Sequence, residues 1–438
     1  MPLIIVISGI ILLFVLIAVF KLNAFISFII VCLLVGILQG MELESVIQSI
    51  QTGMGNTLGY LVLILGLGAM LGKLVADSGA AQRITSKLVS SFGIKYIQWA
   101  VVLAGFIVGI PMFYTVGFVI LVPLVFTVAA ATNLPLIYVG LPMLASLSVT
   151  HGYLPPHPAP TAIATMFNAS IGKTLLYGIL IAIPAIIVAG PLFTRTIKNI
   201  TATPLKEFYN PVVLKDEEMP GMGISIFTAL LPVILIGFST LFDYFLPEHF
   251  PLRKLIIFIG NPVMAMLLSV LVAIYTLGLS RGRKMTEVMD SVTSSIASIT
   301  MVLLIIAGAG ALKQILVDSG VSDYIGELLK DSSISPLVLA WLIATILRVC
   351  IGSATVAGLT AAGIALPLLA GTGVKPELMV LAIGSGSLML SHVNDGGFWL
   401  FKEYFNLTIK ETLSTWTVME TMVGVMGLIG VLALNTIL

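Results

Sequence analysis

The chain has 438 residues, of which 58% are hydrophobic and only 9% are charged, whereas soluble domains have roughly 25% charged residues. This composition excludes a soluble globular domain. It predicts an all-α polytopic membrane protein, because the apolar runs are about 20 residues long and lack the alternation of barrel strands. A net charge of +1 without a basic stripe indicates no nucleic-acid partner. Cys32 and Cys350 lie in apolar segments without metal-ligand spacing, so neither a disulfide framework nor a cofactor is expected.

The predicted elements form two halves joined by a linker, with ten membrane crossings and two hairpins in all. Residues 2–20 lack the basic start and cleavage site of a secretory signal, so we interpret them as a retained first span. The first half, 1–200, contains spans 2–20, 22–40, 60–76 and 174–194, a hairpin over 97–131 and a broken helix over 134–170. A cytoplasmic linker over 201–220 follows, and the second half, 221–438, contains spans 221–241, 254–279, 296–317 and 412–437, a hairpin over 336–371 and a broken helix over 376–406.

The two apolar stretches interpreted as hairpins are each long enough for two helices. They turn at GIPMFYT, residues 109–115, and at CIGSAT, residues 350–355, where glycine and small polar residues interrupt the apolar pattern. Two alternatives remain open at this point: paired full spans, or re-entrant hairpins whose tips stop partway through the membrane. Irregular backbone at that depth is tolerated only where it lines a cavity.

An internal repeat favours the re-entrant alternative. GLGAMLGKLVADSG, residues 66–79, aligns without gaps on AGAGALKQILVDSG, residues 307–320, at an offset of 241 residues. After a loss of three residues, FNASIGKTL at 167–175 aligns on FNLTIKETL at 405–413. We therefore interpret the two halves as duplicates, each with one re-entrant hairpin and one broken helix.

Charge sets the expected orientation of the two repeats. With the N-terminus outside, most lysines and arginines fall in cytoplasmic segments, as the positive-inside rule requires, and both termini are periplasmic. The segment after the first Asp-Ser-Gly carries Arg83, Lys87 and Lys95, whereas its repeat partner carries mainly acidic residues. Equivalent segments then face opposite sides, so the repeats are predicted to be inverted. Inverted repeats with broken helices near the midplane are the recurring architecture of secondary transporters.

The two breaks are SVTHGYLPPHPAPTAIA, residues 148–164, and SHVNDGGF, residues 391–398. A helix cannot continue through the prolines of the first, and each half-helix that begins after a break presents unpaired N–H groups and a partial positive charge to a carboxylate. His151 and His392 occupy equivalent repeat positions, and His157 lies among the prolines. Each histidine could exchange a proton near neutral pH, or could only orient the backbone by donating to a freed carbonyl.

Further polar residues gather at the second break and at the hairpin tips. Asp395, beside Asn394, is either a turn cap or a coupling acid and hydroxyl acceptor, since an ionisable residue at membrane depth is a functional candidate. Arg348 could clamp a carboxylate or pair with a helix-end carbonyl. Small hydroxyl-bearing residues occur at both tips, namely Tyr114, Thr115, Ser353 and Thr355.

Three motifs carry a resemblance to a known family. THGYLPPHPAPTAIA, GSATVAG and SHVNDGGFWLFKEYFNLTI resemble the gluconate permease family, the gluconate:proton symporters, and the similarity covers essentially the whole chain. The resemblance implies import of sugar acids with protons across the bacterial inner membrane. It also implies membership of a wider ion-transporter superfamily with paired re-entrant hairpins, a scaffold that forms homodimers and elevator-type movement. Thr115 departs from the family pattern, which commonly has an acidic residue there, so the place of the coupling acid is open.

The sequence thus predicts a symporter for gluconate or a related sugar acid. Arg348 and the half-helix N-termini are expected to hold the carboxylate. The predicted substrate site comprises His151, Gly152, Tyr114, Thr115, Arg348, Ser353, Thr355, His392, Asn394 and Asp395. The predicted proton carriers are Asp395, His151, His392 and His157.

Three alternatives to this prediction remain open. Sodium coupling is suggested by the hydroxyl groups and carbonyls at GSAT. An intramembrane metal-dependent hydrolase could use three of the histidines, although the helical HExxH arrangement is absent. A channel is a further alternative, since inverted halves also occur in pores.

Overall fold

The computed structural model describes residues 2–438 except 198–199, 201, 203–213, 246, 248–249, 322–323, 325–333, 370–371 and 394. Regular structure in these residues is entirely helical, without any strand. The all-α prediction is therefore confirmed. Most of the predicted linker 201–220 lies outside the described residues, as does Asn394.

The first half of the chain contains nine α-helices in the described residues. They are α1 (Pro2–Phe14), α2 (Ala24–Leu38), α3 (Leu43–Asp77), α4 (Ala80–Phe92), α5 (Ile97–Gly109), α6 (Tyr114–Thr132), α7 (Leu136–Tyr153), α8 (Pro158–Met166) and α9 (Ile171–Ile187). The second half contains α10 (Met222–Phe245), α11 (Arg253–Gly260), α12 (Pro262–Ala273), α13 (Met285–Asp318), α15 (Pro336–Ile351), α16 (Ala354–Ala365), α17 (Pro376–Gly386), α18 (Gly396–Tyr404), α19 (Ile409–Thr412) and α20 (Val418–Ile437).

Five continuous helical segments of the described chain are long and apolar enough to cross a bilayer. They are Ile171–Leu192, Met222–Asp243, Pro262–Arg281, Ile299–Asp318 and Ile409–Ile437. Two bent helix pairs pass the same test, and six apolar helices, including α2, α15 and α17, are shorter. Short apolar helices are expected where hairpins and broken helices stop partway through a membrane. The sequence-based number of ten crossings stays a prediction.

Two helices are longer than the sequence indicated. The predicted span 60–76 is only the second part of α3, which begins at Leu43 and bends by 44° between Gly59 and Leu61. The predicted span 296–317 likewise begins earlier, at Met285 of α13. Hydropathy missed both starts because these first turns mix serine, threonine and acidic residues with apolar ones.

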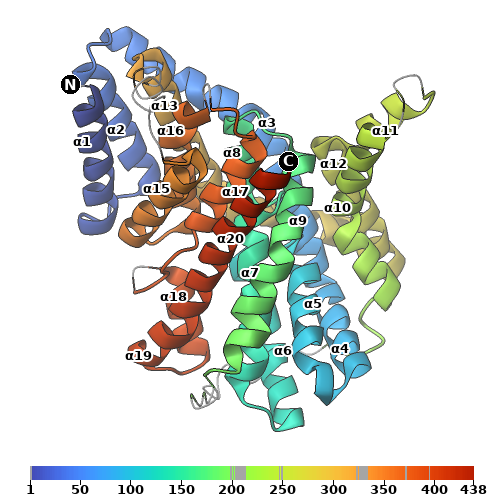
Figure 1. The fold of residues 1–438 in the computed structure, drawn as a ribbon. Coiled ribbons are helices and arrows are strands. Elements are labelled where there is room, and N and C mark those ends of the chain that lie inside the picture. The colour runs from blue at the N-terminus through green and yellow to red at the C-terminus, as the bar shows by residue number, and fades with distance from the viewer. Residues whose placement is uncertain are drawn as a thin grey trace.

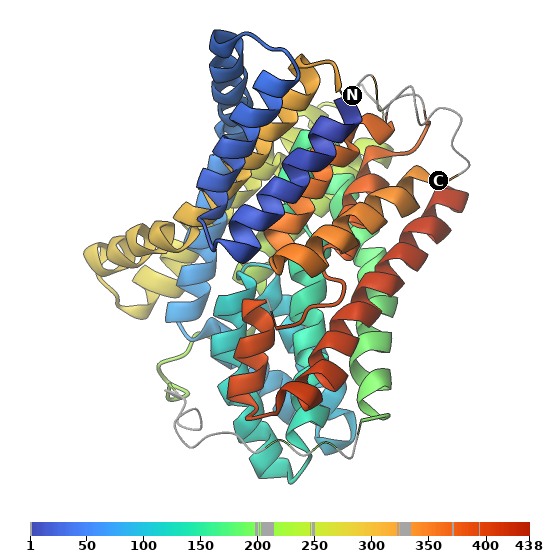
Figure 2. The same cartoon turned by 90° about the vertical axis from the view of Figure 1, so that its left-hand side faces the viewer.

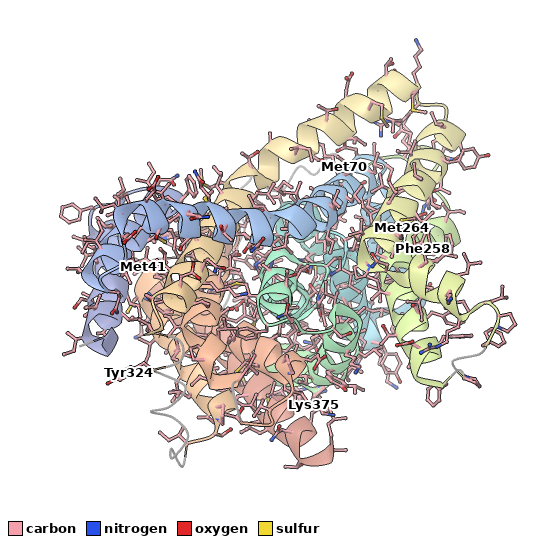
Figure 3. All side chains as sticks on the ribbon, turned by 90° about the horizontal axis from the view of Figure 1, so that it is seen from above. Met41, Met70, Phe258, Met264, Tyr324 and Lys375 are labelled. Carbon is pink, nitrogen blue, oxygen red and sulfur yellow. The ribbon has the colours of Figure 1, made fainter. Side chains whose placement is uncertain are left out.

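The long helices α3 and α13 pack against each other along the molecule. Figure 3, seen from above, shows α3 crossing the molecule from the end near Met41 towards Met70. A Cβ atom at Gly53 would overlap the carbonyl oxygen of Gly310, so the two backbones approach as closely as glycine allows. Each helix ends at an aspartate that accepts a hydroxyl hydrogen bond from the other helix: Ser291 donates to Asp77, and Ser49 donates to Asp318 at 2.5 Å.

The remaining helices flank this pair in three groups (Figure 1). Helices α1 and α2 stand at one side of the molecule, and α10, α11 and α12 stand at the other. Between them lie α5, α7, α9, α17 and α20, with α5 packed on α7 and α17 packed on α20. Figure 2, turned by 90°, shows α1 and α2 in front of this central group.

Four of the predicted irregular segments separate successive helices. Residues 110–113 separate α5 from α6, and residues 352–353 separate α15 from α16. Residues 154–157 separate α7 from α8, where the prolines after Leu154 remove the donors that a continuing helix needs. Residues 387–395 separate α17 from α18. The predicted span 254–279 contains a further break, because Asn261 ends α11 and its side chain caps α12 by accepting from the Val263 N–H at 3.0 Å.

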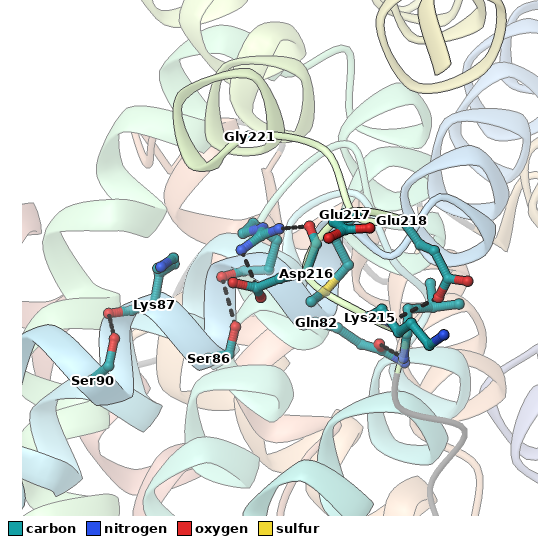
Figure 4. Close-up of polar contacts among 12 residues, drawn as sticks. Gln82, Ser86, Lys87, Ser90, Lys215, Asp216, Glu217, Glu218 and Gly221 are labelled. Carbon is teal, nitrogen blue, oxygen red and sulfur yellow. Dashed lines mark hydrogen bonds and ion pairs between the residues drawn. The ribbon is translucent and has the colours of Figure 1, made fainter. Parts of the chain in front are cut away.

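Arg83 of α4 holds the described end of the linker. Figure 4 shows Asp216 of the linker beside this helix. The guanidinium donates from Nη1 to the Asp216 carboxylate at 3.0 Å and from Nε to the Pro220 carbonyl at 2.9 Å. The neighbouring Gln82 side chain accepts from the Leu214 N–H at 3.2 Å. The chain therefore enters α10 from a fixed point on α4.

Candidate functional site

A cavity of about 510 Å³ lies where the two breaks and the two hairpin tips meet. Its wall comes from α6, α7, α8, α13, α15, α16, α18 and α20 or from the residues just before them. Polar and charged lining residues are Tyr114, Thr115, Ser148, His151, Arg348, Ser353, Thr355, Asp395 and Glu420, and Phe113, Trp416, Ile299 and Val302 add apolar surface. The tertiary structure thus brings seven predicted substrate-site residues to one cavity. They are Tyr114, Thr115, His151, Arg348, Ser353, Thr355 and Asp395.

Four helices begin at this cavity. The first residues of α6, α8, α16 and α18, or their N-cap residues, all line it, and they include Tyr114, Pro158, Ala354 and Gly396. Each helix start carries a partial positive charge of about half an elementary unit. The starts of α6, α16 and α18 also carry N–H groups without intrahelical partners, whereas Pro158 and Pro160 leave only the Ala159 N–H at the start of α8. Four such ends around one cavity create a field that favours an anion.

The starts of α6, α16 and α18 differ in whether a side chain of the preceding residue accepts from their free N–H groups. Ser353 accepts from the Val356 N–H of α16 at 3.4 Å, and Asp395 accepts from the Gly397 N–H of α18 at 3.0 Å. Phe113, before α6, has no side-chain oxygen that could accept from this helix start. The start of α6 at Tyr114 and Thr115 therefore leaves N–H groups free for a ligand from the cavity.

An ion pair joins the second hairpin tip to the second break. Nη2 of Arg348 lies 2.5 Å from Oδ2 of Asp395, and the two side chains are 3% and 17% exposed. Arg348 also donates to the carbonyl oxygen of Gly352 at its own hairpin tip. The Ser391 hydroxyl donates to Asp395, so this carboxylate is held by groups from both sides of the break. Of the described residues, none bonds Nε of Arg348, which stays available in the buried wall.

Two further cavity groups come from Glu420 of α20 and from Trp416 in the helical segment Leu413–Thr417 just before it. Nε1 of Trp416 donates to the Ser391 hydroxyl at 2.8 Å. The Ser148 hydroxyl of α7 donates to the carboxylate of Glu420, which is 2% exposed. Sequence reasoning missed Ser148, Trp416 and Glu420. One signal could have found Glu420, because it is the only charged residue between Thr412 and Ile437.

The histidines separate into two kinds. His151 lines the cavity, with its ring 6.0 Å from that of Tyr114, and its buried Nδ1 has no partner among the described residues. His157 lies behind it and donates from Nε2 to the Gly109 carbonyl at 2.7 Å, at the end of α5. His392 donates from Nε2 to the Val349 carbonyl at 3.1 Å, near the end of α15. Each of these two histidines therefore fastens a break to the adjacent hairpin, and neither lines the cavity.

Gly152 does not line the cavity either. A Cβ atom there would overlap Leu388, and a Cβ atom at Gly384 would overlap the carbonyl oxygen of Gly152. The residue therefore allows α7 and α17 to cross closely, which is a packing role. Asn394 lies outside the described residues, so its predicted contact with substrate stays a prediction.

A family model described as GntP family permease matches residues 1–437. The chain belongs to the GntP permease family. The high-affinity gluconate transporter of Escherichia coli is 56% identical to this chain, and the alignment covers 100% of both chains. The Gnt-II system L-idonate transporter of the same organism is 52% identical, and the gluconate permease of Bacillus subtilis is 49% identical, again over 100% of both chains. The permease is therefore an integral membrane transport protein and not an enzyme, which excludes the hydrolase alternative.

Two solved structures share the fold of the permease. MtrF of Neisseria gonorrhoeae, described as one of a class of antimetabolite efflux pumps, superimposes with a TM-score of 0.64 at 16% identity, covering 94% of each chain. The YdaH transporter of Alcanivorax borkumensis gives a TM-score of 0.62 at 19% identity, covering 94% of this chain and 97% of its own. At these identities the likeness extends to the fold alone.

Proposed function

We propose that the permease imports gluconate or a closely related sugar acid by proton symport. The single observation that carries this proposal is the meeting of four helix N-termini at a cavity with a buried arginine in its wall. Such a site suits a small anion that also has hydroxyl groups. The names of the relatives, which specify gluconate and L-idonate, support the same substrate class.

In this proposal the carboxylate lies between the start of α6 and Arg348. The N–H groups at Tyr114 and Thr115 and the free Nε of Arg348 would donate to it. The sugar hydroxyls would then face the other polar lining residues. These are Ser353, Thr355, Asp395 and His151.

The charges of the cavity support proton coupling. The positive charge of Arg348 is already balanced by Asp395 at 2.5 Å, so a bound carboxylate adds an excess negative charge to a buried site. Uptake of a proton removes that excess. Of the four predicted proton carriers, Asp395 and His151 line the cavity, whereas His157 and His392 bond to backbone carbonyls outside it.

We further propose that the two halves are inverted repeats. The bounds of the helices support this: α3 and α13 end 241 residues apart, at Asp77 and Asp318. Helices α8 and α18 start 238 residues apart and end 238 residues apart, as the loss of three residues in the sequence alignment of the two halves requires. Asn168 and Asn406, which follow them at the same spacing, both have positive φ, at 52° and 50°.

The remaining features of the proposal are architectural. We expect a homodimer in the bacterial inner membrane with both termini in the periplasm. We also expect an elevator-type movement that carries the hairpins and broken helices past the other helices. The shared fold with known transporters supports a common architecture.

Reconstituted vesicles test the proposed function. Uptake of labelled gluconate should rise with an inward proton gradient and collapse with a protonophore, whereas uptake that ignores both would overturn proton symport. Replacing sodium with choline should leave uptake unchanged, and loss of uptake would instead establish sodium coupling. Exchange of external label against internal gluconate should saturate, which a channel would not show.

A further inference from the structure

Glu420 stands apart among the charged groups of the cavity. Among the described residues that line the cavity, Arg348 is the only lysine or arginine, and it pairs with Asp395 rather than with Glu420. Within the described part of the chain, Glu420 has no ion-pair partner, yet it is 2% exposed. A buried carboxylate without a cation is much less stable when ionised than it is in water.

The groups that face Glu420 come from four elements. Tyr114 lies on α6, His151 and Tyr153 lie on α7, Arg348 lies on α15, and Asp395 precedes α18. The Tyr153 hydroxyl donates to the Val423 carbonyl on α20, so its hydrogen is not available to Glu420. The direct polar contact of the Glu420 carboxylate is the Ser148 hydroxyl. Two carboxylates and one guanidinium therefore share the wall, and only one carboxylate is compensated.

The other candidate carriers are less suited to binding a proton with the substrate and releasing it when the substrate leaves. Asp395 already accepts from Arg348, Ser391 and the Gly397 N–H, so its oxygens are occupied by contacts within the protein. A proton on His151 would place a second positive charge beside Arg348 in a desolvated wall. His157 and His392 point to carbonyls away from the cavity.

We propose that Glu420 takes up the coupled proton when the sugar acid binds and releases it when the substrate leaves. This inference rests on the proposed proton symport and assigns its acid. An ionised Glu420 repels an incoming carboxylate and a protonated Glu420 does not, so substrate and proton strengthen each other's binding. When Glu420 is neutral, the substrate carboxylate is the only negative charge in the loaded cavity that lacks a positive partner. When Glu420 is ionised, there are two such charges.

The packing of α20 keeps Glu420 at the site. One turn earlier, Trp416 bonds to Ser391, and Thr417 donates to the Ser391 carbonyl. One turn later, a Cβ atom at Gly424 would overlap Met389. The acid is therefore held against the second break. Its repeat counterpart at the offset of 238 residues is Ala182, so the arrangement occurs in one half only.

The test uses the full-length protein in proteoliposomes, with Glu420→Gln compared to wild type and to Glu44→Gln, an exposed acid in the first turn of α3. Glutamine keeps the shape and cannot carry the proton. Glu420→Gln should lose accumulation of labelled gluconate under an inward proton gradient, while exchange against internal gluconate at equal pH remains measurable. Glu44→Gln should accumulate as wild type does. Gradient-driven accumulation by Glu420→Gln would overturn the role of Glu420, whereas a wild type that ignores the gradient would overturn symport itself.

A second variant keeps the inference testable if Glu420→Gln does not fold. Ser148→Ala removes the hydroxyl donor that stabilises the ionised carboxylate, so the proton should bind more readily. In the wild type, gluconate affinity should fall as the pH rises and Glu420 loses its proton. In purified Ser148→Ala this fall should occur at a higher pH. An unchanged pH dependence in Ser148→Ala would contradict the assignment of Glu420.

Discussion

Arg348 and Asp395 lie 47 residues apart in sequence and meet at 2.5 Å, across the gap between a hairpin tip and a broken helix. The guanidinium reaches the tip carbonyl of Gly352 on one side and the carboxylate on the other. The pair therefore fixes the second hairpin to the second break, at the same place where substrate is proposed to bind. A change at either residue should affect both stability and binding.

We expect Arg348→Gln to unfold more easily than wild type, because removal of one partner from a buried pair costs about 3–5 kcal/mol. Gluconate binding to the purified protein should fall below detection, since the carboxylate loses its cation. Thermal unfolding in detergent and binding of labelled gluconate measure the two effects.

Asp395→Asn combined with Arg348→Gln provides the matched control. If the two groups interact as a pair, the double variant should be more stable than the sum of the single variants by roughly 0.5–3 kcal/mol. Strict additivity would contradict the pair, and unchanged gluconate binding by Arg348→Gln would remove the arginine from the substrate site.

Thr115→Glu places a negative charge at the second residue of α6, facing the cavity. The helix end should tolerate this charge, because an acidic side chain near a helix N-terminus is stabilised by about 0.3–1 kcal/mol. The same charge should compete with the substrate carboxylate. We therefore expect gluconate affinity to decrease at least about tenfold, which equals 1.4 kcal/mol, while the unfolding temperature is retained.

Thr115→Ser is the control for this substitution, since it keeps a hydroxyl of similar size and should bind gluconate nearly as well as wild type. Equal affinity of Thr115→Glu and wild type in equilibrium binding would place the carboxylate elsewhere than at the start of α6.

His157→Ala should destabilise the protein without changing how uptake depends on pH. Loss of the ring leaves the buried Gly109 carbonyl without its donor, which costs about 1–3 kcal/mol. His157→Gln, whose amide can still donate, should recover part of the loss. Thermal unfolding and the pH profile of vesicle uptake separate this fastening role from the predicted proton role, and a flattened pH profile in His157→Gln would restore the latter.

The crossing of α3 and α13 provides a prediction about the scaffold. Gly53→Ala should lower the unfolding temperature, because the added methyl would overlap the Gly310 carbonyl oxygen and approach the Ala311 Cα at 2.9 Å. Overpacking of this kind costs roughly 1–3 kcal/mol. Gly55→Ala, two residues along the same helix, meets nothing within 4 Å and should be neutral or slightly stabilising. Equal unfolding temperatures for the two variants would contradict the close crossing.

The helical membrane class and the main helix breaks could be predicted from the amino-acid sequence alone, as could seven of the residues that line the cavity. Proline chemistry set the break before Pro158, and the isolated charges Arg348 and Asp395 marked the site, since both follow from local rules about backbone donors and buried charge. The starts of α3 and α13 were not found, because polar turns packed between helices do not appear in a hydropathy pattern.

Which of these residues share the cavity became evident only from the packing of the helices. It placed Ser148 against Glu420 from 272 residues away, and it turned His157 and His392 towards carbonyls rather than towards the site. Side-chain direction depends on how helices cross, and those crossings depend on contacts between distant segments, such as Gly152 with Leu388. No local sequence pattern contains that information. Candidate site residues can therefore be predicted from sequence, but the contacts among them require the tertiary structure.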